Sequence, residues 1–174
     1  MNFENLGILE STIDNLNYKK EEDWINYPKS MIWSMKDEGF TIDKGFDILY
    51  YGNIPNGSGL SSSAAFEVLV CEIINLMYLN GVLDPVTKAV VSQYAENVYF
   101  GKPCGLLDQM ASSLGGFTYA DFANPADPIT ESIELDIKSY GYTLCVVDTG
   151  GNHANLNDDY ASIPSEMKAV AAML

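Results

Sequence analysis

The sequence predicts an α+β fold in which helices cover one face of a mostly antiparallel sheet. Segments with helical spacing of apolar residues and segments with strand-like alternation both occur along the chain. They do not follow the regular strand–helix–strand order of a parallel sheet, which favours helices packed on antiparallel strands. The hydrophobic content of 47% in 174 residues is enough for one substantial core.

Five segments are predicted to be helices because apolar residues recur on one side and start or stop residues stand at their ends. Pro28 falls in the first turn of the first segment, and Gly39 follows its end. Gly81 stops the second segment, and Asp84 caps the third before Pro85. The predicted helices cover residues 24–38, 62–80, 85 to about 100, 106–113, and 158 or 159 to 173.

Four shorter segments are predicted to be strands. Each is a short apolar or alternating run, and turn residues such as Gly115-Gly116 stand between several of them. Residues 1–22 are polar and weakly patterned, and no repeat or interdomain linker is visible. The predicted strands cover residues 46–51, 117–121, 133–136 and 142–148.

The composition excludes several classes of partner. The net charge is −15, from 9 basic and 24 acidic residues, so binding to nucleic acid or to an anionic membrane surface is not expected. No signal peptide pattern and no apolar run long enough for a membrane span is present, so we expect a cytoplasmic protein. Three widely separated cysteines, an odd number, are typical of thiols in a reducing compartment: Cys71, Cys104 and Cys145.

The most informative segment is the loop at residues 55–65, which reads Pro-Asn-Gly-Ser-Gly-Leu-Ser-Ser-Ser-Ala-Ala. It lies between a predicted strand and a predicted helix. Its two glycines allow a tight turn and a close backbone approach, and its hydroxyls gather where a helix N-terminus attracts anions. This pattern indicates a phosphate cradle. It is neither a Walker A loop nor a nucleophile elbow, and its structural alternative is an ordinary turn capped by serine.

This loop and its flanks resemble the ATP-binding motif of the GHMP small-molecule kinases, and the triple serine resembles the galactokinase branch. The segment from Cys104 to Gln109, Cys-Gly-Leu-Leu-Asp-Gln, is similar to the catalytic-Asp segment of that family. Glu96, twelve residues before Asp108, matches a magnesium-binding Glu. Residues 24–29 and 158–160 resemble two further galactokinase segments.

The resemblance implies a role for each matched residue. Asp108 would be catalytic, accepting or favouring the loss of a sugar hydroxyl proton, and Mg²⁺ would be held by Ser63 and Glu96. The sugar would be contacted by Gly105, Asp108 and Tyr160. The structural alternatives are a solvated helix glutamate for Glu96, a helix cap for Asp108 and a packing aromatic for Tyr160. The ATP phosphates would be bound by Gly57, Ser58, Gly59, Leu60, Ser61, Ser62 and Ser63.

The resemblance also implies an architecture. Family members pair an N-terminal domain similar to ribosomal protein S5 domain 2 with a ferredoxin-like C-terminal domain. We expect residues 1–174 to be a partial N-terminal domain, with at most the start of the second domain near the end. The family's early segment of the type G-R-V-N-L-I-G-E-H-T-D-Y and its Gly-rich third motif have no counterpart here, and the chain contains no arginine.

The expected reaction is phosphorylation of galactose by ATP to galactose 1-phosphate, with Mg²⁺ relieving the negative field around the phosphates. We expect this chain alone to be poorly active or inactive, because the family's Arg beside the catalytic Asp is missing. A non-catalytic sugar and ATP sensor, a truncated gene product, and another sugar such as N-acetylgalactosamine are the alternatives. Edges exposed by truncation are expected to favour self-association.

Overall fold

The computed structural model describes residues 7–55, 58–125, 127–147 and 157–173. It combines helices with a two-stranded antiparallel sheet, so the predicted α+β class is confirmed. The elements in chain order are η1 (Lys20–Ile25), α1 (Asn26–Asp37), α2 (Ser62–Tyr78), α3 (Pro85–Tyr94), η2 (Ala95–Tyr99), α4 (Leu107–Leu114), β1 (Phe117–Asp121), β2 (Ile129–Ile133) and α5 (Asn157–Ala171).

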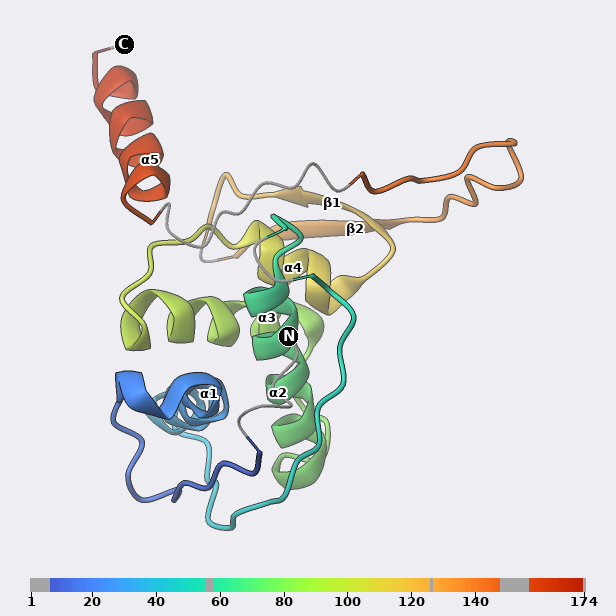
Figure 1. Cartoon of the computed structure of the whole chain (residues 1–174). Coiled ribbons are helices and arrows are strands. Elements are labelled where there is room, and N and C mark those ends of the chain that lie inside the picture. The colour runs from blue at the N-terminus through green and yellow to red at the C-terminus, as the bar shows by residue number, and fades with distance from the viewer. Residues whose placement is uncertain (1–6, 56–57, 126, 148–156, 174) are drawn as a thin grey trace.

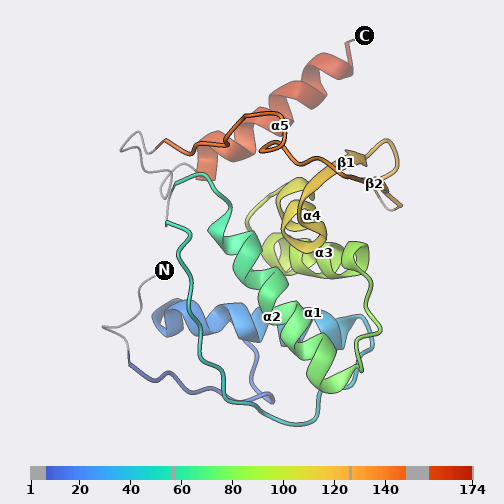
Figure 2. The same cartoon turned by 90° about the vertical axis from the view of Figure 1, so that its right-hand side faces the viewer.

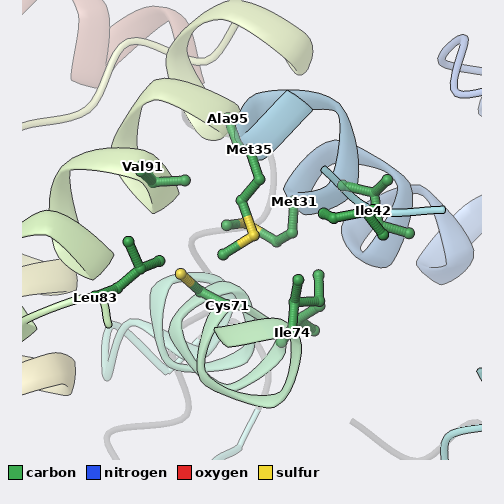
Figure 3. Packing of buried hydrophobic residues seen from close by; sticks show 10 residues of the cluster. Met31, Met35, Ile42, Cys71, Ile74, Leu83, Val91 and Ala95 are labelled. Carbon is green, nitrogen blue, oxygen red and sulfur yellow. The ribbon is translucent and has the colours of Figure 1, made fainter. Parts of the chain in front are cut away.

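Helices α1, α2 and α3 enclose the main hydrophobic core (Figure 1 and Figure 2). Figure 3 shows Met31 and Met35 of α1 pointing toward Cys71 of α2 and Val91 of α3. Both methionines are fully buried, and their flexible side chains fill the space between the three helices. A polar contact adds to this packing, because Ser34 donates its hydroxyl to the Val91 carbonyl at 3.0 Å.

The helix ends follow the sequence signals. Asp84 accepts hydrogen bonds from the amides of Val86 and Thr87 at 2.9 and 3.0 Å, and Pro85 occupies the first position of α3. Gly39 has φ +90°, a conformation that ordinary residues avoid, and it closes the end of α1. Helix α2 begins at Ser62 and α3 at Pro85, so the predicted starts at residues 62 and 85 are confirmed.

Helix α4 is held against α3 by a second, smaller cluster. Ala89 of α3 packs with Leu106 and Met110, and Phe122, which follows β1, covers them. The two strands form an antiparallel ladder in which Phe117 faces Ile133 and Asp121 faces Ile129. This arrangement places α4 beneath the start of the hairpin (Figure 1). The predicted strand at residues 117–121 is confirmed with the same bounds.

Three predicted strands differ from the structure. Residues 46–51 form no strand, residues 134–136 lie beyond the end of β2, and residues 142–147 form no strand; residue 148 lies outside the described residues. The physical reason is pairing, because a strand exists only where a neighbour takes its backbone hydrogen bonds. Within the described ranges β1 and β2 alone provide such a ladder.

Helix α5 stands away from the helical core in both views (Figure 1 and Figure 2). Its described side chains, from residue 162 onward, are all exposed. The helix starts and ends within two residues of the predicted span of 158 or 159 to 173. Among the described residues, no helix combines the length and apolar character that crossing a membrane requires.

Candidate active site

The serine-rich loop ends at the N-terminus of α2 with an unusual backbone. Gly59 has φ +73°, and Ser61, the residue before the helix, has φ +56° and ψ +45°. A left-handed conformation costs a residue with a side chain about 1–3 kcal/mol, and such strain gathers at ligand sites. The Ser61 side chain makes no capping hydrogen bond to α2, so it does not occupy the amides of the first turn.

Ser63 and Glu96, the two residues predicted to hold magnesium, lie in contact. The Ser63 hydroxyl, in the first turn of α2, donates to Glu96 Oε1 at 3.2 Å across 33 positions of sequence. Glu96 is only 8% exposed, so the alternative of a solvated surface glutamate is wrong. A hydroxyl and a carboxylate beside a helix N-terminus are hard oxygen ligands, the donor set that Mg²⁺ takes together with phosphate oxygens.

Glu96 belongs to a π-helical turn, η2, which sequence patterning did not reveal. The adjacent Asn97 accepts a hydrogen bond from the Cys104 amide at 2.7 Å and donates to the Cys104 carbonyl at 3.4 Å. Gln93 of α3 donates to the same carbonyl at 3.1 Å. Single π turns are frequent at functional sites. This turn connects the Glu96 carboxylate and the loop that leads to Asp108.

Two further buried polar residues complete the interior of the site. Gln109 donates through Nε2 to Glu96 Oε2 at 2.8 Å, and its side chain is fully buried. Glu67 lies on α2, one helical turn after Ser63, and is also 0% exposed. Neither Glu67 oxygen has hydrogen-bond geometry with a described residue, although the Gln109 side chain lies close enough to oppose the rise in the Glu67 pKa. Burial, reinforced by the nearby Glu96 carboxylate, raises the pKa of Glu67 well above its usual value.

Asp108 occupies the first turn of α4, next to the buried Gln109 but on the exposed side. It is an exposed residue and makes no hydrogen bond or ion pair to another described residue. Gly105 is exposed, and a Cβ there would meet no heavy atom within 4 Å. Packing does not require glycine at this position, and the space beside it is open.

The thiol of Cys104 is not activated. Burial, together with the negative charge of Glu96, raises its pKa to about 12. A thiol in this environment stays protonated and unreactive at neutral pH. Cys104 Sγ instead accepts a long hydrogen bond of 3.7 Å from Gln109 Nε2.

A hollow of about 940 Å³ lies beside the serine-rich loop. Ser62 of α2 borders it, and Trp24, Tyr50 and Phe66 supply aromatic walls. Tyr50 and Phe66 lie 4.4 Å apart between ring centroids. Hollows of this size and apolar character are typical of small-molecule sites.

Comparison with known proteins establishes the family. The model of the GHMP kinases N terminal domain matches residues 26–116, more than half of the chain, and this range contains the loop, Glu96 and Asp108. The chain belongs to the GHMP kinase family. It is 39% identical to galactokinase of Clostridium beijerinckii over 99% of this chain and 43% of that protein. It is 36% identical to galactokinase of Bacillus subtilis over 91% of this chain and 40% of that protein.

A solved structure of a galactokinase is also similar to this chain. The crystal structure of Lactococcus lactis galactokinase complexed with galactose matches with a TM-score of 0.67 and 36% sequence identity. The match covers 77% of this chain and 35% of that one. The chain thus spans less than half the length of the curated relatives it matches.

The structure places some of the predicted site residues of this chain together and leaves others outside its described residues. The structure brings Ser63 and Glu96 together and places Asp108 on the helix that also carries their neighbour Gln109. Gly57 and the side chain of Tyr160 lie outside the described residues, so their predicted contacts stay predictions. Sequence reasoning missed Glu67, although its spacing of four from Ser63 puts both on one face of α2.

Proposed function

We propose that this chain belongs to an ATP-dependent sugar 1-kinase of the galactokinase type. The observation that carries the proposal is the 3.2 Å contact between Ser63 and Glu96. These residues come from α2 and η2, and their side chains meet at the end of a glycine- and serine-rich loop. A hydroxyl paired with a carboxylate at a helix N-terminus fits a magnesium–phosphate ligand better than it fits packing.

ATP would lie with its phosphates against the loop. The backbone amides between Gly57 and Ser63 would cradle them, since the Ser61 side chain leaves the first turn of α2 uncapped. No cluster of three metal-ligating side chains occurs in the described part of the chain, so Ser63 and Glu96 would need phosphate oxygens and water to complete a magnesium shell. Bound magnesium would neutralise the phosphate charge, which matters in a chain of net charge −15.

Asp108 would act on the sugar. Its exposed carboxylate, with no partner in the described residues, is available to accept the proton of a sugar hydroxyl as that oxygen attacks the γ-phosphorus. The open space at Gly105 would admit the sugar next to the backbone. Tyr160 would add a further contact to the sugar.

Galactose is the substrate that the comparisons favour, since the matched relatives are galactokinases and the solved relative holds galactose. N-acetylgalactosamine is the alternative sugar. We further propose that residues 1–174 correspond to part of the N-terminal domain, with at most the start of the C-terminal domain. The half-buried, unactivated thiol of Cys104 is consistent with a cytoplasmic protein.

These 174 residues should turn over galactose poorly. The chain has no arginine to stabilise the charge beside Asp108. Removal of one preorganised electrostatic group costs about 10²–10³ in rate. A sugar and ATP sensor is the second candidate, because a chain without an arginine beside Asp108 could bind both ligands and still lack turnover.

Isothermal titration with Mg·ATP, with and without galactose, tests the proposal. We expect Mg·ATP binding that survives Asp108→Asn and weakens in Glu96→Gln, because only Glu96 belongs to the metal site. Galactose binding that is lost in Asp108→Asn would support the sugar assignment. A folded chain that binds no Mg·ATP would refute the nucleotide assignment.

A further inference from the structure

Each oxygen of the Glu96 carboxylate has its own donor. Ser63 donates to Oε1 at 3.2 Å, and Gln109 donates to Oε2 at 2.8 Å. The amide nitrogen must be the atom that faces Glu96, since a carboxylate can only accept. Two donors on opposite oxygens fix both the position and the rotation of the carboxylate.

Gln109 is poorly explained as a packing residue. Its side chain is 0% exposed, and its Oε1 has no hydrogen-bond partner among the described residues. Burying an unsatisfied amide oxygen costs free energy, and an apolar side chain would avoid that cost. Met110, the next residue of α4, shows that this helix does use apolar side chains where packing alone is needed. The 2.8 Å hydrogen bond to Glu96 is a compensating gain, and Gln109 also donates to Cys104 Sγ at 3.7 Å and interacts with the Glu67 carboxyl.

Gln109 also links two parts of the site. Asp108 and Gln109 are consecutive in the first turn of α4, and one is exposed while the other is buried. The buried amide reaches inward to η2, and the exposed carboxylate faces outward. The same rigid helix turn therefore carries the predicted catalytic group and the donor to the predicted metal ligand.

We propose that Gln109 is a positioning residue that holds the Glu96 carboxylate for magnesium and fixes the metal site to the helix that presents Asp108. This inference rests on the proposed function, since it assigns a partner to the same metal site. Residues that hydrogen-bond a metal ligand from behind orient it, and their removal typically costs about 10- to 100-fold in metal affinity.

The test uses the whole chain and measures the free Mg²⁺ concentration required for half-maximal ATP binding by titration calorimetry. Gln109→Met removes the amide at nearly constant volume, and we expect the Mg²⁺ requirement to rise about 10- to 100-fold. Asn75→Leu is the matched control, because Asn75 is a buried amide of α2 whose Oδ1 accepts from the Leu83 amide at 3.0 Å. It should lower thermal stability without changing the Mg²⁺ requirement.

A double variant tests whether Gln109 affects the Mg²⁺ requirement through Glu96. In the Glu96→Gln background, Gln109→Met should cause no further rise in the Mg²⁺ requirement, because the two residues act as one unit. If Gln109→Met does not fold by circular dichroism, Gln109→Asn replaces it. That variant keeps the amide but is one methylene too short to reach Glu96, and it should raise the Mg²⁺ requirement in the same direction.

The outcomes separate the two proposals. Binding of Mg·ATP by the unaltered chain, with the same Mg²⁺ requirement in a folded Gln109 variant, would overturn the positioning role and leave the proposed function intact. An equal effect of Gln109→Met with and without Glu96 would also overturn it. An unaltered chain that binds no Mg·ATP would remove the proposed function and this inference together.

Discussion

Glu67 offers a sharp test of the site's electrostatics, because it is a fully buried carboxyl with no hydrogen-bond partner among the described residues. Its folded-state pKa is raised well above normal by burial and by Glu96, while Gln109 and Lys102 lower it by less. A raised carboxyl pKa means that the folded chain holds a proton that the unfolded chain has already released. In metal-free buffer, Glu67 therefore destabilises the fold progressively as pH rises from its unfolded pKa of about 4.3 toward the folded pKa.

The magnitude follows from linkage. Between the two pKa values, each pH unit removes about 1.4 kcal/mol from the free energy of unfolding. Glu67→Gln replaces the carboxyl with a neutral amide of the same shape and abolishes this loss. We expect the variant to gain stability relative to the unaltered chain as pH rises, with a slope of about 1.4 kcal/mol per pH unit.

Urea unfolding followed by circular dichroism, in the presence of EDTA and from about pH 5 upward, measures this slope and the pH at which it ends. Glu72→Gln is the control on the same helix. Hydrogen bonds from Lys88 and Asn75 lower the pKa of Glu72. The ionised Glu72 therefore stabilises the folded state above its unfolded pKa, and this stabilisation is lost in acid. Its variant should therefore differ in stability from the unaltered chain by a constant amount at and above about pH 5, with no slope of its own. Parallel pH profiles for Glu67→Gln and the unaltered chain would refute the reasoning.

Two further predictions concern the cap of α3 and the exposed apolar surface. Asp84→Ala should lower the free energy of unfolding by about 1 kcal/mol, because it removes the acceptor for two amides of α3. Asp84→Asn keeps an acceptor oxygen and should lower it by less. Urea unfolding measures both variants, and equal losses of stability would contradict the capping argument. The chain should self-associate as concentration rises, since Leu49 and Tyr51 are 99% and 91% exposed on an unpaired extended segment. Sedimentation velocity should show a shift toward monomer in Leu49→Lys combined with Tyr51→Lys, and a chain that is monomeric at every concentration would contradict it.

Local signals predicted the helical part of the fold well. The cap at Asp84 with Pro85, and the serine-rich start of α2, act within a few residues, so sequence alone located them. The contact of Ser63 with Glu96 was predictable through the family resemblance, although 33 positions separate the two residues. Family membership itself is confirmed by the match over residues 26–116.

The features that sequence analysis predicted wrongly or missed depend on tertiary contacts, which the pattern of residues along the chain does not specify. Residues 46–51 alternate like a strand, yet a strand forms only with a partner, and alternation says nothing about the partner. Glu67 resembles an ordinary helix glutamate, and its burial depends on how α2, η2 and α4 pack around it. The role of Gln109 was equally hidden, because its acceptor, Glu96, lies 13 positions away on a turn of irregular winding.

The π turn η2 makes the site sensitive to the number of residues in the chain as well as to their identity. A π turn has one residue more than an α-helical turn. In η2, the neighbouring residues Glu96 and Asn97 hydrogen-bond different partners, Ser63 and Cys104. Deleting a single residue between positions 95 and 99 would give a regular helix, which is locally favourable, but it would rotate one flank by about 100° relative to the other. Deleting the exposed Val98 would remove no core side chain, yet it would uncouple the proposed metal site from the loop that leads to Asp108. A one-residue deletion scan through this helix should therefore show loss of Mg·ATP binding at η2 with little loss of helical content.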